Sequence, residues 1–131
     1  MRRILFTLSL LLLLTGCGGR AAPASAPETL VQRVGGATVS LTLAPAPPAG
    51  DTQETFTLSL TRAGRPLAGE TVFLNAGMVT MGMGSTHWQL QPTGPGRYQG
   101  RGRFPMAGEW RVRVTAGGPR KLRASFYVVV N

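Results

Sequence analysis

Apolar and polar residues alternate with a period of two through most of the chain after residue 38. The alternation falls into seven segments, near residues 39–43, 55–61, 69–77, 87–91, 97–104, 110–114 and 122–130. Turn-forming sequences rich in glycine and proline, such as APAPPAGD at 44–51 and PTGPG at 92–96, separate the segments. A period of two is typical of a strand with one buried and one solvated face, and no helical period is evident after residue 28. The pattern therefore predicts an all-β protein.

Seven short strands in about 100 residues are typical of an antiparallel immunoglobulin-like sandwich, and a small closed barrel is the alternative. The chain has a single cysteine, Cys17, so no intramolecular disulfide can join the two sheets. Large aromatic side chains are expected to fill the core instead; they are Phe56, Trp88, Tyr98, Trp110 and Phe126. We assign residues 31–131 to this one domain.

The first seventeen residues predict export and a lipid anchor. A short basic start is followed by an apolar run from Ile4 to Leu14, which is too short to span a bilayer but matches a secretory signal. The run ends in Leu14-Thr15-Gly16-Cys17, which resembles the bacterial lipobox. The resemblance implies that residues 1–16 are a signal peptide and that Cys17 carries lipid. The alternative is a plain secretory signal with an incidental thiol.

Residues 17–30 are predicted to form the lipidated cysteine and a flexible tether. Alanine, proline, glycine and serine dominate the sequence CGGRAAPASAPETL. Such a composition cannot build a packed core. The protein is therefore expected in the cell envelope, held outside the cytoplasm by its lipid.

The chain carries a formal charge of +9, which falls to +7 when Arg2 and Arg3 are removed with the signal peptide. Nucleic acid is an unsuitable partner for an exported lipoprotein, so anionic lipid or an acidic protein is the expected one. If the last three strands pair consecutively, their outward positions form a basic docking face of Arg97, Arg101, Arg103, Arg111, Arg113, Lys121 and Arg123. The alternative is a solvated face whose arginine stems cover apolar surface.

Three sequence features between residues 69 and 114 resemble one known family. They are the cluster Met81-Gly82-Met83-Gly84, the following His87, and GRYQGRGRFPMAGEWRVRV at 96–114 with its Pro-Met-Ala-Gly-Glu-Trp turn. Together they resemble the YtkA-like domain family, a relative of FixH-type periplasmic domains. The resemblance implies an immunoglobulin-like sandwich outside the cytoplasm and a link to copper handling. The family often places histidine directly after the Met-Gly pair, whereas Gly84-Ser85-Thr86 intervene here.

The methionine and histidine side chains suggest a site for copper. Thioether sulfur is a soft, neutral ligand that selects Cu(I), and imidazole also suits copper. The glycines beside Met81 and Met83 would let the loop fold around an ion, and the alternation directs His87 away from the core. We predict a Cu(I) site formed by Met81, Met83 and His87, with Met106 as a fourth ligand. Met78 is expected to pack in the core instead.

These features predict a membrane-anchored module that holds or delivers Cu(I) for oxidase assembly or copper tolerance, with a membrane protein or oxidase as partner. The alternative is a metal-free interaction module that docks on a membrane protein or an anionic surface. We expect no enzymatic activity, because the five carboxylates are scattered, His87 has no evident carboxylate to orient it, and no phosphate-binding loop precedes a helix.

Overall fold

The computed structural model describes residues 26–82, 85–117 and 121–131, and these residues form nine β-strands and no helix. The predicted signal peptide, Cys17 and Met83 lie outside the described residues. None of the described residues belongs to a helix able to cross a membrane. The strands are β1 (Glu28–Val34), β2 (Ala37–Ala44), β3 (Gln53–Arg62), β4 (Arg65–Pro66), β5 (Thr71–Met78), β6 (Ser85–Gly94), β7 (Arg97–Arg103), β8 (Gly108–Gly117) and β9 (Leu122–Val130).

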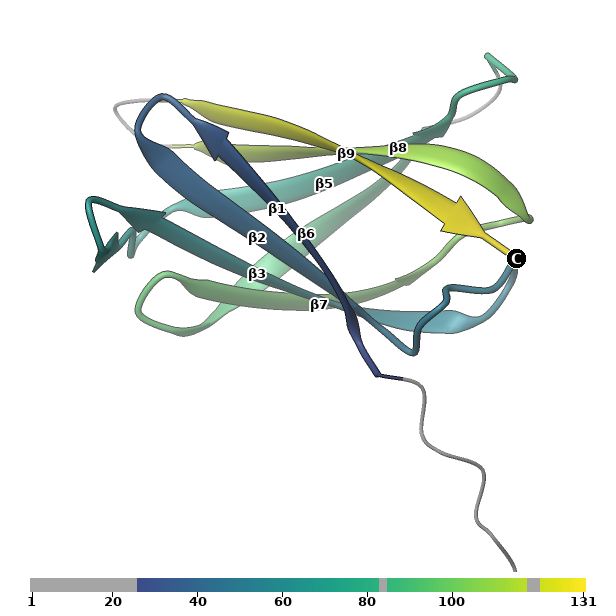
Figure 1. The fold of residues 1–131 in the computed structure, drawn as a ribbon. Coiled ribbons are helices and arrows are strands. Elements are labelled where there is room, and N and C mark those ends of the chain that lie inside the picture. The colour runs from purple at the N-terminus through teal and green to yellow at the C-terminus, as the bar shows by residue number, and fades with distance from the viewer. Residues whose placement is uncertain (1–25, 83–84, 118–120) are drawn as a thin grey trace, which may run out of the picture.

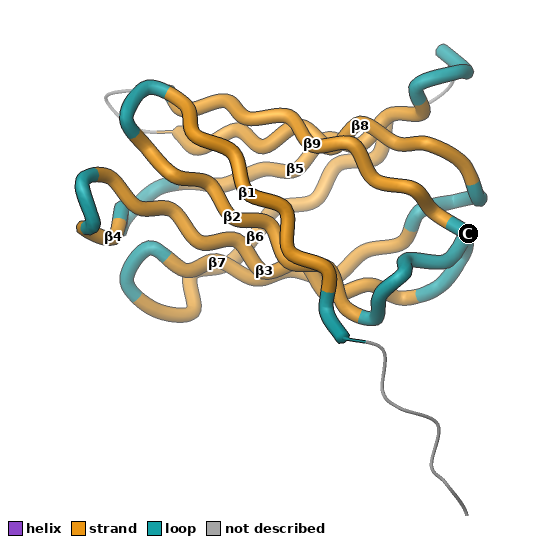
Figure 2. The backbone as a smooth tube through the Cα atoms, in the orientation of Figure 1, coloured by secondary structure: helices purple, strands orange, loops and turns teal. Residues whose placement is uncertain are grey.

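The strands pair antiparallel in the order β1-β2-β3-β7-β6-β5-β8-β9, with the short β4 on β3. Strands β1, β2, β3 and β7 form one layer, and β5, β8 and β9 form the other (Figure 1). Strand β6 passes between the layers, because residues 85–90 pair with β5 whereas residues 91–94 pair with β7. The first and last strands, β1 and β9, also lie next to each other, so the sandwich is barrel-like (Figure 2). This confirms the predicted all-β antiparallel sandwich and adds the barrel character of the alternative.

All seven predicted strands are present, as β2, β3 and β5 to β9, and two further strands were not predicted. The first, β1, starts at Glu28, so it includes the last three residues of the segment predicted as tether. Strand β1 joins β2 through Gly35 and Gly36, which have φ values of 56° and 76°. Two positive φ values are what a two-residue type I′ hairpin requires.

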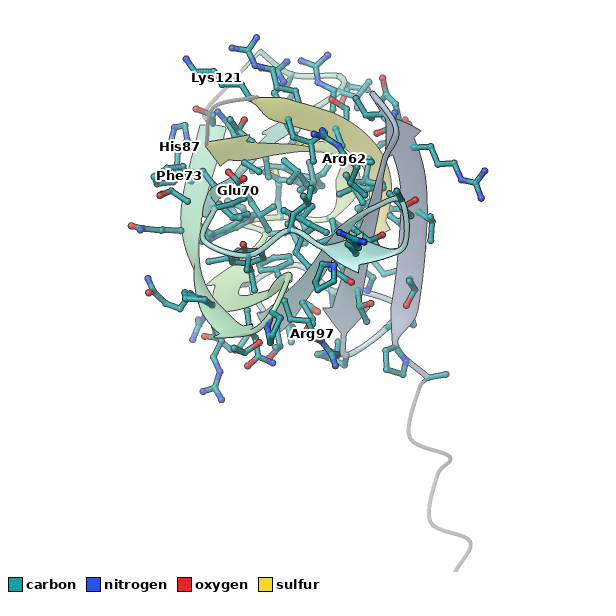
Figure 3. The ribbon with its side chains drawn as sticks, turned by 90° about the vertical axis from the view of Figure 1, so that its left-hand side faces the viewer. Arg62, Glu70, Phe73, His87, Arg97 and Lys121 are labelled. Carbon is teal, nitrogen blue, oxygen red and sulfur yellow. The ribbon has the colours of Figure 1, made fainter. Side chains whose placement is uncertain are left out.

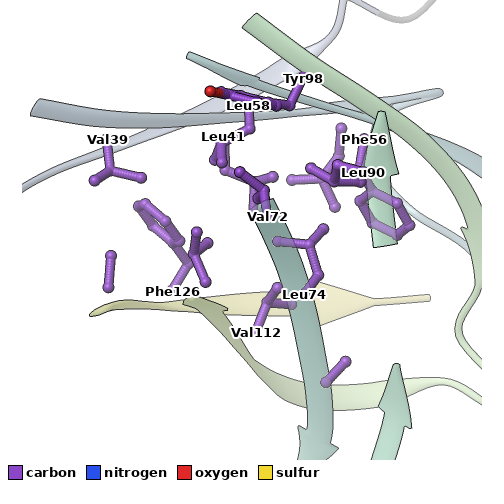
Figure 4. Close-up of a cluster of buried hydrophobic side chains, with 14 of the residues drawn as sticks. Val39, Leu41, Phe56, Leu58, Val72, Leu74, Leu90, Tyr98, Val112 and Phe126 are labelled. Atoms are coloured by element: carbon purple, nitrogen blue, oxygen red, sulfur yellow. The ribbon is translucent and has the colours of Figure 1, made fainter. Parts of the chain in front are cut away.

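The core lies between the two layers and is built from the inward positions of each strand (Figure 4). Phe56, Tyr98, Trp110 and Phe126 are buried as predicted, and Trp88 is partly buried against them. The Trp88 ring stacks on Phe56 with ring centroids 4.7 Å apart and also lies against Gly102, where any side chain would overlap the indole. Glycine at 102 therefore lets β7 pass close to this aromatic cluster.

Candidate functional site

One end of the sandwich holds a pocket lined by three of the chain's methionines. This Met pocket has a volume of about 320 Å³, and its lining consists of Met78, Met81, Ser85, Thr86, Pro105, Met106 and Trp110. These residues come from the end of β5 and the loop after it, the start of β6, the β7–β8 connection and the start of β8 (Figure 1). Met81 and Met106 are 54% and 50% exposed, so two of the three thioether side chains are accessible to a ligand from solvent.

Met78 reaches the pocket because of its position at the end of β5. It shares the inward direction of Leu74 and Ala76, and in register it pairs with Trp110 of β8. Its terminal methyl lies over Gly108, where a β-carbon would come within 2.6 Å of it. The next residue, Val79, donates its N–H to the Glu109 carbonyl at 2.9 Å. These contacts hold Met78 against the wall of the pocket.

Met106 is held by the turn that joins β7 to β8. The indole N–H of Trp110 donates to the Met106 carbonyl at 3.1 Å, and the Phe104 ring is fully buried at the start of the turn. Gly50 packs against the backbone of Met106 from the other side, since a β-carbon there would lie 3.1 Å from the Met106 carbonyl carbon. The Pro-Met turn is therefore fixed through its backbone, and the Met106 side chain remains half exposed.

The structure places the predicted copper ligands in three different situations. Met81 and Met106 come together at the Met pocket, and Met78, which we expected to be core, lines it with them. Met83 lies outside the described residues. His87 does not line the pocket.

The position of His87 follows from the direction of its side chain on β6. It points outward as predicted (Figure 3). Its inward neighbour Thr86 lines the Met pocket. On the outer face, the Nε2 atom of His87 lies 3.1 Å from the hydroxyl of Ser85, within hydrogen-bonding distance. His87 therefore lies beside Ser85, which lines the Met pocket, but His87 is not itself part of the lining.

The seven predicted basic residues do not share one face. Strands β7 and β8 belong to different layers, so the consecutive pairing on which the prediction depended does not occur. The outward basic side chains of β7 are Arg97, Arg101 and Arg103, whereas Arg111, Arg113 and Arg123 lie on the outer face of β8 and β9. Arg97 and Lys121 accordingly appear on opposite sides of the molecule (Figure 3).

Glu54 is a buried carboxyl that the sequence analysis overlooked. Its exposed fraction is 0%, and neither carboxylate oxygen has a hydrogen-bond partner among the described residues. Burial raises the pKa of Glu54, and the nearby backbone amide of Ala49 lowers it by a smaller amount. The alternation could have predicted this burial, because Glu54 occupies the same inward-facing set of alternate positions on β3 as Phe56 and Leu58.

The sequence model of the YtkA-like family matches residues 32–115, which is more than half of the chain. The chain belongs to the YtkA-like family. The matched region of this YtkA-like protein contains every residue that lines the Met pocket. A prokaryotic membrane lipoprotein lipid attachment site matches residues 1–17. The protein is therefore a lipid-anchored protein of the cell envelope, with its YtkA-like domain outside the cytoplasm.

Among solved structures, the YtkA-like protein is similar to a crystal structure of a DUF4426 family protein from Pseudomonas aeruginosa PAO1. The two have a TM-score of 0.55 and 15% sequence identity, over 78% of this chain and 94% of the other. At this identity the likeness supports the fold alone. No curated protein matches the chain.

Proposed function

We propose that this YtkA-like lipoprotein binds Cu(I) in the Met pocket and holds or delivers the ion outside the cytoplasm. The observation that carries the proposal is the convergence of Met78 and Met81 from the end of β5 and its loop, and of Met106 from the β7–β8 connection, onto one pocket. Thioether sulfur is soft and neutral, which is the ligand chemistry that selects Cu(I). Thioethers also need no deprotonation, so binding through them requires no release of a proton.

The side chains of the Met pocket fit Cu(I) better than a harder ion. Zinc sites use cysteine, histidine and carboxylates, and calcium sites use several oxygen ligands. The described residues contain no group of three or more His, Cys, Asp or Glu that could hold a metal, and the pocket lining includes none of these residue types. We therefore assign the site to Met78, Met81 and Met106, with Met83 as the proposed fourth ligand from the same loop. His87 as a direct ligand stays a prediction.

The exposure of the methionine ligands would allow Cu(I) to be passed to an acceptor. Met81 and Met106 are each about half exposed, so an acceptor could approach the ion and exchange ligands one at a time. A membrane protein or oxidase is the proposed acceptor, because the lipid anchor keeps the domain at the membrane surface. No acid–base side chain lines the pocket, and we propose binding and transfer without catalysis.

The test is anaerobic Cu(I) titration of the mature lipoprotein in neutral detergent against a competing chelator. The double change Met81→Leu and Met106→Leu keeps volume and apolarity, and such swaps cost less than about 1.5 kcal/mol each. We expect the variant to remain folded and its Cu(I) affinity to fall at least about tenfold, because two soft ligands are gone. A matched control is Val79→Ala, which removes exposed apolar surface beside the pocket but no sulfur. Unchanged affinity in the folded double variant would refute the copper site.

The second candidate is a metal-free interaction module, and the apolar lining of the Met pocket favours it. Methionine is flexible and is common at surfaces that bind apolar groups of other proteins. In this case Leu at positions 81 and 106 would preserve partner binding, whereas Val79→Ala would weaken it. The two candidates therefore predict opposite outcomes for the same pair of variants.

A further inference from the structure

A second hollow lies on the outer face of β5, β8 and β9, and it shares no lining residue with the Met pocket. This basin has a volume of about 590 Å³ and is lined by Asn75, Arg113, Thr115, Arg123 and Ser125. All five residues occupy outward positions of their strands. None of them lines the Met pocket or takes part in the proposed copper binding.

The register of three strands sets the arrangement of the basin. Asn75 pairs with Arg113, and Arg113 pairs with Ser125 across the β8–β9 ladder. In the neighbouring row, Thr115 pairs with Arg123. Arg113 and Arg123 are thus diagonal neighbours, which lie about 7–8 Å apart in such a sheet. Arg113 thus has Asn75 and Ser125 as its cross-strand neighbours, and Arg123 has Thr115.

Among the residues that the structure describes, no carboxylate forms an ion pair with Arg113 or Arg123. The one ion pair among the described residues joins Arg103 to Asp51 at 3.6 Å, on the other layer. No carboxylate lines the basin, and Arg111 on the same face lines an adjoining hollow together with Arg113. Like charges on neighbouring strands repel each other. An anion bound between Arg113 and Arg123 would remove this repulsion.

The side chains also indicate the class of anion. Each guanidinium presents a planar set of N–H donors that matches phosphate oxygens, and the Asn75 amide and two hydroxyls supply further donors. A volume of about 590 Å³ exceeds one phosphate ion and falls within the usual range of small-ligand sites. Phe73, which is 45% exposed, pairs with Thr115 and so lies next to the basin without lining it.

We propose that this basin binds the phosphoryl group of a small phosphate ester, with Arg113 and Arg123 holding the phosphate from two sides. The ester has two possible sources, a soluble metabolite or a phospholipid headgroup of the membrane that carries the protein.

The experiment is calorimetric titration of the mature lipoprotein in neutral detergent. Inorganic phosphate and glycerol 3-phosphate represent the soluble source, micelles doped with phosphatidylglycerol represent the lipid source, and acetate tests for binding of any anion. We expect glycerol 3-phosphate to bind at least about tenfold more tightly than acetate, because only the phosphoryl group engages both guanidinium groups in bidentate contacts. Binding of the doped micelles alone would assign the basin to lipid and still support the phosphoryl site.

The matched variants carry the same change in charge on different layers. Arg113→Gln with Arg123→Gln removes the basin's cations, and Arg97→Gln with Arg101→Gln removes two outward cations of β7. We expect at least a tenfold loss of phosphate-ester affinity in the first and less than a twofold change in the second. Asn75→Ala should give a smaller loss than the first pair. Equal losses in both arginine pairs, or acetate binding as tight as glycerol 3-phosphate, would overturn the proposal.

Discussion

At the scale of single residues, Glu54 gives the clearest link between burial and pH. Its carboxyl is fully buried, and desolvation raises its pKa above the ordinary value. The folded state therefore keeps this proton to a higher pH than the unfolded state does. The free energy of unfolding should fall as pH rises from the unfolded pKa through the raised folded pKa, and should level off above it.

The variant Glu54→Gln removes this titration while keeping a similar shape. We expect its free energy of unfolding to depend less on pH than that of the parent between about pH 4 and 8, and to exceed the parent value at the upper end. Urea denaturation of parent and variant at several pH values measures the free energy of unfolding and its dependence on pH. All other titrating groups are common to the two proteins, so the difference isolates Glu54. Parallel curves would mean that Glu54 ionises in the folded state as readily as in water.

At the scale of strands, the alternation predicted seven elements because each has one face against a single core. It missed β1, whose inward residues are only partly buried and whose outward residues include the exposed Val31. It also could not give the pairing of β7 and β8. Neighbouring strands in sequence pair in most cases, but here residues 104–107 carry the chain from one layer to the other. That single connection separates the predicted basic residues and places Met106 at the pocket.

The β1–β2 hairpin offers a test of turn chemistry that involves no packing. Gly36 has a φ of 76°, and a β-carbon there would meet nothing within 4 Å. The change Gly36→Ala should therefore act only through the backbone and lower the free energy of unfolding by roughly 1–2 kcal/mol. For a domain of this size each 1 kcal/mol corresponds to about 4–8 °C in Tm.

The matched control for that prediction is Gly35→Asn at the preceding position. Asparagine tolerates a positive φ, and Asn-Gly is a preferred pair in type I′ turns. Thermal unfolding should show little change for Gly35→Asn and a clear loss for Gly36→Ala. Equal Tm values for the two variants would show that strand β1 contributes nothing to the cooperative unfolding of the domain.

At the scale of the whole molecule, the two candidate sites lie on different parts of one scaffold. The Met pocket opens at an end of the sandwich, and the phosphate basin lies on the outer face of β5, β8 and β9. The sequence could indicate Met81 and Met106 because soft ligands beside glycine and proline turns are unusual in so small a chain. It could not indicate the basin, because Asn75, Arg113 and Ser125 meet only through pairing across three strands.

The lipid anchor determines where both sites operate, and Cys17 is the residue that tests it. The lipid attachment site matches residues 1–17 and ends at this cysteine, the chain's only one. The first lipid is expected on its sulfur, so Cys17→Ser should prevent lipid attachment at this residue. We expect the variant either to accumulate as the uncleaved precursor or to leave the membrane fraction, as followed by fractionation and intact mass. A control change of the nearby Ser25→Ala should leave both the added lipid mass and the membrane fraction unaltered.

Because one acyl chain gives only marginal binding whereas two signals anchor stably, a Cys17→Ser protein that is cleaved and still membrane-bound would require a second anchor in the domain itself.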